Sequence, residues 1–404
     1  MVTDTDPKRW STLAILSTAE LLGMSLWFAA SAVSPQLALR WSLSSQQTGW
    51  LTTIVQLGFV CGTALAAALN VADVFASKKL FAWSAGIAAI VNAAILLAPG
   101  YDAALVLRFL TGFFLAGVYP PAMKMISTWF QGQRGLAIGT IVGALTVGKA
   151  TPYLIHALPN VGVTAVIVTA SCAAGIASLL VAAAYDDGPY PFSSRPFSWG
   201  LVATVVRVRD WRLATSGYLG HMWELYAFWT WIPAFLAASV AASSTPGTSK
   251  GIVSLVSFGT IAVGGAGCVW GGLTADRSGR ERLVTIALVV SGTCSLIIGL
   301  FFGASIWVIA PVALVWGFFV VADSAQFSAL VTESVPSHAV GTALTVQTSI
   351  GFLLTMVTIQ GIPMIAARTG WRWSFAVLAA GPAVGILAIR TLATSRRVQA
   401  LARG

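Results

Sequence analysis

Residues 272–282 read Gly-Leu-Thr-Ala-Asp-Arg-Ser-Gly-Arg-Glu-Arg and separate two long apolar runs, at 250–272 and 283–303. Each run is close to the roughly 20 residues that an α-helix needs to cross the hydrocarbon core of a bilayer. Short loops rich in Arg are typical of the cytoplasmic side of membrane proteins. The stretch therefore predicts two membrane-spanning helices joined by a tight, charged loop.

The composition of the whole chain agrees with this local pattern. Of its 404 residues, 57% are hydrophobic and only 9% are charged, against about 25% charged in a typical soluble domain. These values exclude a soluble globular protein, and they exclude a disordered chain, which needs low hydrophobicity and high charge. The apolar runs are too long and continuous for the alternating strands of a membrane barrel. The sequence predicts an all-α, multi-pass membrane protein.

Charged residues, glycines and prolines divide the chain into twelve expected spans. They lie at about 11–33, 46–69, 79–98, 103–130, 135–157, 162–184, 213–239, 250–272, 283–303, 306–331, 340–364 and 371–391. The loops are short except for 185–212, which is polar and rich in Pro, Ser and Arg. We therefore expect two six-helix bundles, over 1–184 and 213–404, joined by a cytoplasmic linker at 185–212.

The formal net charge of +10 reflects an uneven distribution of basic residues between the loops. Sixteen of the 23 Lys and Arg residues fall on the side of the termini and the linker, four on the other side and three within spans. The positive-inside rule predicts that both termini and the linker are cytoplasmic. The expected location is the plasma (bacterial inner) membrane. This distribution explains the charge without a nucleic-acid partner. The four cysteines lie in apolar runs, so no disulfide framework or metal site is expected.

The two expected bundles share residues at an almost constant offset. Glu20 and Trp27 recur as Glu224 and Trp231, at an offset of 204. Three further matches have offsets of 203 to 206, in order along the chain: Asp73 with Asp276, Gly112 with Gly317, and Gly135 with Gly341. Such ordered matches indicate an internal duplication. Many secondary transporters are built from repeated halves, with the substrate site near mid-membrane between them.

The stretch 272–282 also resembles the G-x-x-x-D-R-x-G-R-x-R signature of the major facilitator superfamily. The matching positions are Gly272, Asp276, Arg277, Gly279, Arg280 and Arg282. The resemblance covers the whole chain in span number, duplication and central loop, and Arg108 with Gly112 fits the family's R-x-x-x-G pattern in the fourth span. It implies twelve helices in two pseudo-symmetric bundles, with a loop that locks the cytoplasmic helix ends and releases them when that face opens.

Two features depart from the family pattern. The first-half copy of the signature keeps only Asp73 and a basic residue at Lys79, so its lock is weaker or built differently. In the fifth span the Gly-Pro and paired glycines of the drug-antiporter signature are absent, and Gly148 is followed by Lys149. The second departure counts against a drug/proton antiporter.

Ionisable residues inside the expected spans are candidate functional groups, because a charge in the bilayer core is costly unless it is paired or faces water. Glu20 and Glu224 fall near the middle of the first and seventh spans, and Asp323 falls in the tenth. The resemblance implies that spans 1, 4, 7 and 10 line a central cavity. We expect these three acids to bind and release protons as the cavity alternates between dry and wet; a static ion-pair network is the alternative.

Basic and aromatic side chains in the same spans are the candidate substrate ligands. Arg108 offers a planar fork suited to carboxylate, sulfonate or phosphate oxygens, and Lys149 offers a second cation. The seventh span is unusually aromatic over 220–231, which suits either an organic substrate or helix packing. The expected substrate-binding residues are Arg108, Lys149, His221, Trp27, Tyr226 and Trp231.

Together these residues predict a secondary transporter that moves a small, anionic organic solute by alternating access, in symport with protons. Two alternatives stay open: a proton-coupled exporter of drugs or cations, and a carrier of inorganic oxyanions. The chain contains no phosphate loop, no nucleophile–His–acid set and no cluster of metal ligands, so neither an enzyme nor a cofactor is expected. The expected partners are the substrate, protons and the lipid bilayer, and the expected state is a monomer.

Overall fold

The computed structural model describes residues 6–71, 75–131, 133–190, 197–243 and 249–401, and its regular elements are helices. Asp73 of the expected gating motif lies outside these residues. The helices that precede the central linker are α1 (Lys8–Met24), α2 (Ala29–Ala32), α3 (Ser34–Trp41), α4 (Ser45–Ala68), α6 (Ser77–Ala93), η1 (Ala94–Leu97), α7 (Tyr101–Leu115), α8 (Tyr119–Ser127), α9 (Arg134–His156) and α10 (Val163–Ala184).

The linker and the second half contain the remaining helices. They are α11 (Trp199–Arg207), α12 (Arg209–Ala242), α13 (Lys250–Ser278), α14 (Arg280–Ile297), η2 (Ile298–Phe301), α15 (Ile306–Ala322), α16 (Ser324–Ser334), η3 (Ser337–Ala339), α17 (Val340–Thr369), η4 (Trp371–Trp373), η5 (Ala376–Ala379) and α18 (Ala380–Leu401).

Within the described ranges, eleven helical segments are long and apolar enough to cross a membrane. The expected first span falls short because it is interrupted between Met24, where α1 ends, and Ala29, where α2 begins. The fourth span is also interrupted, since Pro120 stands in the first turn of α8 and a proline cannot continue a preceding helix. The prediction of an all-α membrane protein is confirmed, with a helix count close to twelve.

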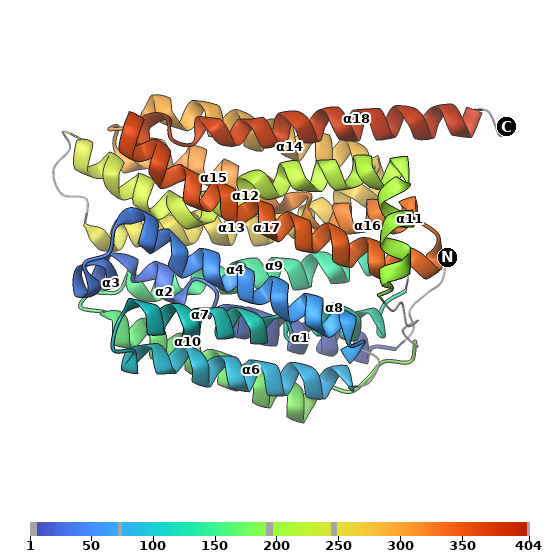
Figure 1. Cartoon of the computed structure of the whole chain (residues 1–404), viewed down its shortest axis with the longest axis horizontal. Coiled ribbons are helices and arrows are strands. Elements are labelled where there is room, and N and C mark those ends of the chain that lie inside the picture. The colour runs from blue at the N-terminus through green and yellow to red at the C-terminus, as the bar shows by residue number, and fades with distance from the viewer. Residues whose placement is uncertain (1–5, 72–74, 132, 191–196, 244–248, 402–404) are drawn as a thin grey trace.

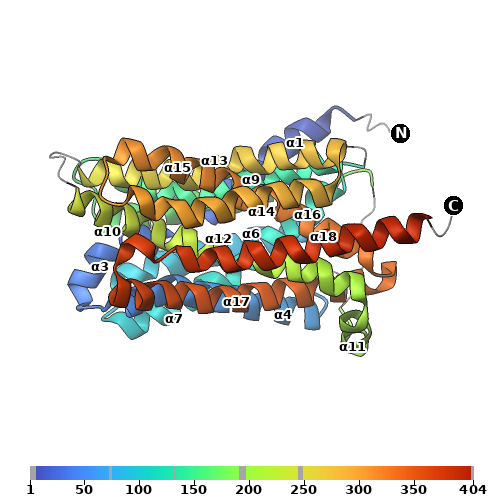
Figure 2. The same ribbon diagram turned by 90° about the horizontal axis from the view of Figure 1, so that it is seen from above.

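The helices run along one long axis in two groups (Figures 1 and 2). In Figure 1 the blue-to-green helices of the first half lie below the yellow-to-red helices of the second half. Helix α1 begins and α18 ends at the same end of the molecule, where α11 also lies. We call this the basic end, because the loops that sequence analysis found rich in Lys and Arg lie there.

Two helix pairs, α9 with α13 and α4 with α17, join the halves. Small residues allow the backbones of α9 and α13 to approach closely. A Cβ atom on Gly143 would lie 2.8 Å from the carbonyl oxygen of Gly265, and one on Gly272 would lie 2.9 Å from that of Gly135. Close contact through small residues is a common way for membrane helices to associate.

The region expected to be a linker contains one short helix, α11, which packs on α12 and α17. The backbone amide of Ser198 donates a hydrogen bond of 3.0 Å to Thr342 Oγ1. Helix α12 then begins at Arg209, four residues before the start expected for the seventh span. The division into bundles at 184 and 213 stays a prediction.

Candidate functional site

The interruption of the first span is held open by Arg108. This fully buried residue of α7 donates from Nη1 to Leu26 O at 2.9 Å, from Nη2 to Trp27 O and from Nε to Leu51 O at 3.2 Å. Its Nη1 also lies 3.4 Å from Asn92 Oδ1. Leu26 and Trp27 follow the end of α1, where carbonyl groups lack intrahelical donors, and the guanidinium of Arg108 donates to them. Leu51 lies within α4, so Arg108 also connects α7 to that helix. All three nitrogens of Arg108 are therefore bound within the protein.

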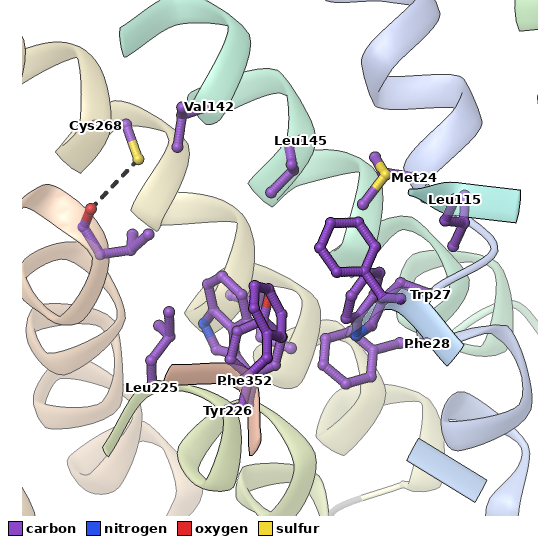
Figure 3. Close-up of a cluster of buried hydrophobic side chains, with 14 of the residues drawn as sticks. Met24, Trp27, Phe28, Leu115, Val142, Leu145, Leu225, Tyr226, Cys268 and Phe352 are labelled. Atoms are coloured by element: carbon purple, nitrogen blue, oxygen red, sulfur yellow. Dashed lines mark hydrogen bonds between the residues drawn. The ribbon is translucent and has the colours of Figure 1, made fainter. Parts of the chain in front are cut away.

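A cluster of aromatic rings fills the space between the two halves beside this interruption (Figure 3). Trp27 and Phe59 come from the first half, and Tyr226 and Phe352 come from α12 and α17 of the second half. The ring centroids lie 5.3 Å apart for Trp27 and Phe59, 5.8 Å for Trp27 and Tyr226, and 4.9 Å for Phe59 and Phe352. We call these four residues the aromatic cluster. Its members from both halves are in direct contact.

Lys149 of α9 places its ammonium against this cluster. The side chain is buried, and Nζ donates a hydrogen bond of 2.6 Å to the hydroxyl of Tyr226. The same nitrogen lies 4.1 Å from the centroid of Trp27 and 5.3 Å from that of Trp229, within the range of cation–π attraction. Among the described residues it forms no ion pair with a carboxylate. The cation is thus held by rings and one hydroxyl.

Glu20 of α1 lies near Lys149 and is completely buried. The two side chains interact electrostatically, and α1 packs directly on α9 because Gly148 leaves room for the carbonyl oxygen of Leu21. Neither carboxyl oxygen of Glu20 has a hydrogen-bond partner among the residues that the structure describes. A buried acid without donors is the kind of membrane group that marks a proton or ion pathway.

The other expected proton carriers lie within the second half. Glu224 accepts a hydrogen bond of 2.8 Å from Ser291 Oγ and one of 2.7 Å from Trp316 Nε1, so both carboxyl oxygens are bound. His221, one turn earlier on α12, has its Nδ1 2.9 Å from Asp323 Oδ1. Asp323 stands at the junction of α15 and α16. The structure thus separates the buried charges into three groups: Arg108, Glu20 with Lys149, and the His221, Glu224 and Asp323 group.

Trp231 is the remaining expected substrate ligand. Its Nε1 donates a hydrogen bond of 2.7 Å to Ile359 O, and its ring lies 5.9 Å from that of Trp371. These contacts link α12 to α17 and η4, beyond the aromatic cluster.

The signature stretch lies where the halves meet at the basic end. A Cβ atom on Gly135, at the start of α9, would lie 2.9 Å from Asp276 Oδ2. Carboxylates near a helix N-terminus are favourable because of the helix dipole. Gly279 has a φ of 87°, which glycine adopts readily and which lets α14 follow α13 directly. Arg277 and Arg282 are exposed.

Sequence analysis missed the ion pairs that surround this stretch. Arg280 Nε lies 3.0 Å from Glu333 Oε1, and Arg396 Nη1 lies 3.0 Å from Glu281 Oε1 and 3.1 Å from Glu333 Oε2. These contacts join α14, α16 and α18. The pattern of the signature gave no signal for Glu333 or Arg396, because they lie more than 50 residues away in the chain.

A second missed contact joins the halves at the end opposite the basic end. His156 at the end of α9 lies between two polar side chains, with Nε2 2.7 Å from Gln36 Nε2 and Nδ1 2.9 Å from Ser254 Oγ. Gln36 belongs to α3, and Ser254 belongs to α13 of the second half. Polar contacts between the halves are therefore present at both ends of the molecule.

Comparison with known proteins identifies the family. A model of the Major Facilitator Superfamily matches residues 15–359. Over 155 residues the chain is 30% identical to the puromycin resistance protein pur8 of Streptomyces alboniger. This match covers 37% of this chain and 30% of pur8. Over 144 residues it is 29% identical to the niacin transporter NiaP of Acinetobacter baylyi. This match covers 31% of this chain and 32% of NiaP. The matches thus span about a third of each curated relative.

Solved structures show the same fold over the full length. A bacterial homologue of the human lysosomal transporter Spinster, inward-facing and unoccupied, matches with a TM-score of 0.72 at 16% identity, covering 96% of this chain and 98% of that one. An inward-facing, occupied form of such a homologue matches with a TM-score of 0.67 at 15% identity, covering 97% and 98%. Since the family match extends over most of its length, the chain belongs to the Major Facilitator Superfamily and is a membrane transporter rather than an enzyme.

Proposed function

We propose that this transporter moves a small organic anion in symport with protons, and that Lys149 binds the anion. The observation that carries the proposal is the position of its ammonium, which is buried where the two halves meet and is held by Tyr226 and two tryptophan rings. Among the described residues no carboxylate is in ion-pair contact with this ammonium, and Glu20 interacts with it only at longer range. An anionic ligand that contacts the ammonium directly is therefore attracted to this apolar site. The rings offer stacking surfaces for an aromatic or apolar body.

The relatives suggest two substrate classes. Niacin is an aromatic monocarboxylate, and a ligand of this kind matches a cation surrounded by rings. Puromycin resistance supports the alternative of an exporter. The buried Lys149 favours the anion, because a cationic drug would be repelled at this position.

Glu20 is the proposed site of proton coupling. It interacts electrostatically with Lys149 and has no hydrogen-bond partner among the described residues. An anion bound to Lys149 would cancel the positive charge that compensates the Glu20 carboxylate. Anion binding then favours protonation of Glu20, and by linkage protonation favours anion binding. This reciprocity is what a proton symporter requires.

The remaining expected site residues receive more specific roles in the proposal. Arg108 positions Trp27 through the backbone, and Trp231 links α12 to α17. The pair of His221 and Asp323 forms a second proton-accepting group within the second half, and Glu224 is a structural acid, since both of its oxygens are bound.

Alternating access is proposed to use the contacts between the halves at the two ends. The contact of Asp276 with the start of α9 holds the basic end, and the contact of His156 with Gln36 and Ser254 holds the opposite end. The basic end is proposed to face the cytoplasm of a bacterial inner membrane, following the distribution of Lys and Arg. The protein is proposed to act as a monomer.

Uptake into proteoliposomes tests the function. An inward proton gradient should drive accumulation of radiolabelled nicotinate or benzoate, and Lys149→Gln should abolish it. The panel should include an aryl sulfonate, nitrate and puromycin. Depletion of puromycin under the same gradient, without carboxylate accumulation, would support the exporter instead. Nitrate accumulation alone would support the carrier of inorganic oxyanions.

A further inference from the structure

A groove of about 600 Å³ lies at the basic end between the start of α12 and the last turns of α18. Two arginines line it, Arg209 from α12 and Arg390 from α18, together with Leu387, Val398 and small hydroxyl residues. Both arginines are exposed. No hydrogen bond or ion pair engages either guanidinium within the part of the chain that the structure describes. The two charges are therefore available to a ligand.

Three hydroxyl residues line the groove, Thr391, Thr394 and Ser395, and the two threonines are already engaged within the helix. Thr391 Oγ1 donates to Leu387 O at 2.7 Å, and Thr394 Oγ1 donates to Arg390 O at 3.0 Å. Their protons are thus bound within α18. A ligand at this site is recognised mainly by two guanidinium groups, whose planar forks suit phosphate oxygens.

The groove is continuous with the surface that faces the lipid. Leu387 precedes Arg390 by three residues on α18, and Val384 precedes Leu387 by another three, so each neighbours the next on the helix surface. Val384 and Leu387 are 56% and 68% exposed. Arg390 falls at the end of the twelfth expected span and Arg209 one turn before the seventh. A membrane-spanning chain therefore places these arginines at headgroup depth, with an apolar track leading from them toward the bilayer centre.

We infer that this groove binds the headgroup of an anionic phospholipid, whose phosphate bridges Arg209 and Arg390 while an acyl chain lies along Leu387 and Val384. Positive charge facing the lipid surface, two arginines that no described residue engages, and an adjoining apolar track all match this one ligand. The inference rests on the chain spanning a membrane and is independent of the proposed substrate and of proton coupling.

Native mass spectrometry of the full-length protein tests the inference. Detergent-solubilised protein is titrated with phosphatidylglycerol and, separately, with phosphatidylcholine of the same chain length. The wild type should retain phosphatidylglycerol preferentially. The double variant Arg209→Gln/Arg390→Gln should bind phosphatidylglycerol about thirtyfold more weakly, with phosphatidylcholine binding unchanged. Arg209→Lys/Arg390→Lys should recover most of the binding because it keeps both charges.

The matched control removes two charges from the same end without touching the groove. Arg207 and Arg397 are exposed and do not line it, so Arg207→Gln/Arg397→Gln should leave phosphatidylglycerol binding close to wild type. An equal loss in this control would overturn the inference, because general surface charge would then explain retention. Equal retention of the two lipids by the wild type, or full displacement of phosphatidylglycerol by excess inorganic phosphate, would overturn it as well.

Discussion

Lys149 Nζ in α9 lies 2.6 Å from the hydroxyl of Tyr226 in α12, so a charge of the first half is held by a hydroxyl of the second half. The contact is buried and surrounded by aromatic rings. Any movement that separates the halves at this level must break it. The same movement would release the ammonium for another partner, which connects substrate binding with the change of conformation.

Replacing Lys149 by glutamine should weaken binding of the transported anion about tenfold to hundredfold, the range expected for loss of a hydrogen bond to a charged group. Lys149→Arg should not restore full affinity, because the planar guanidinium does not fit where a compact ammonium contacts three rings. Isothermal titration with the best substrate of the transport panel measures the change.

The control for this variant is Lys250→Gln. Lys250 is an exposed lysine at the start of α13, so its loss changes the net charge equally. Affinity should stay within about threefold of wild type, since exposed charges contribute little at a distance. If Lys149→Gln binds the substrate with wild-type affinity, Lys149 is not the anion site.

Replacing Glu20 by glutamine should separate transport from the proton gradient. A glutamine fills the same volume but cannot release or take up a proton. Accumulation driven by an inward acid gradient should disappear, while exchange of internal for external substrate at equal pH should continue. Uptake by the wild type should rise as the external pH falls, and uptake by the variant should not.

Asp102→Asn is the matched control, because Asp102 is an exposed acid in the first turn of α7. Its pH dependence should follow that of the wild type. If Glu20→Gln still accumulates substrate against a gradient in response to pH, protons are coupled elsewhere, and His221 with Asp323 becomes the group to test next.

Arg108→Gln should lower stability without acting on the anion directly. The variant leaves the carbonyl groups of Leu26, Trp27 and Leu51 with fewer donors in a buried site, at a cost of about 1–3 kcal/mol for each group that stays unsatisfied. The apparent Tm should fall by several degrees with and without substrate, and tryptophan fluorescence should change as Trp27 loses its support. Arg40→Gln, at an exposed site, is the control.

A different pattern of Tm values would instead support direct binding of the anion by Arg108. In that case the variant would keep the wild-type Tm in the absence of substrate. It would lose only the increase in Tm that saturating substrate confers.

The spans could be predicted from the sequence because each depends on local composition. The interruption at residues 25–28 could not, because Ser25, Leu26, Trp27 and Phe28 include neither glycine nor proline. The donors that satisfy its carbonyl groups come from Arg108, about 80 residues further along the chain. Periodicity and turn signals do not report such a distant contact.

The duplication places Glu20 and Glu224 at matching positions of the two halves, yet the structure gives them different environments. Glu224 accepts hydrogen bonds from Ser291 and Trp316. At offsets of 204 and 205 these donors correspond to Ile87, which has no donor, and Thr111, whose hydroxyl donates to Leu107 O. The halves therefore kept the acid and diverged in its partners, which a match of the acids alone does not reveal.

Gly148→Ala should disturb both stability and coupling, because the new Cβ atom would overlap the carbonyl oxygen of Leu21. The overlap is with backbone, so α1 and α9 must move apart, and Glu20 must move away from Lys149. Overpacking of this kind typically costs about 1–3 kcal/mol.

Gly175→Ala in α10 is the matched control, since a Cβ atom there meets no atom within 4 Å and alanine is the better helix former. We expect the apparent Tm and gradient-driven uptake to fall in Gly148→Ala, and Gly175→Ala to match or exceed the wild-type Tm. Unchanged uptake in a folded Gly148→Ala protein would show that coupling does not depend on the close approach of α1 to α9.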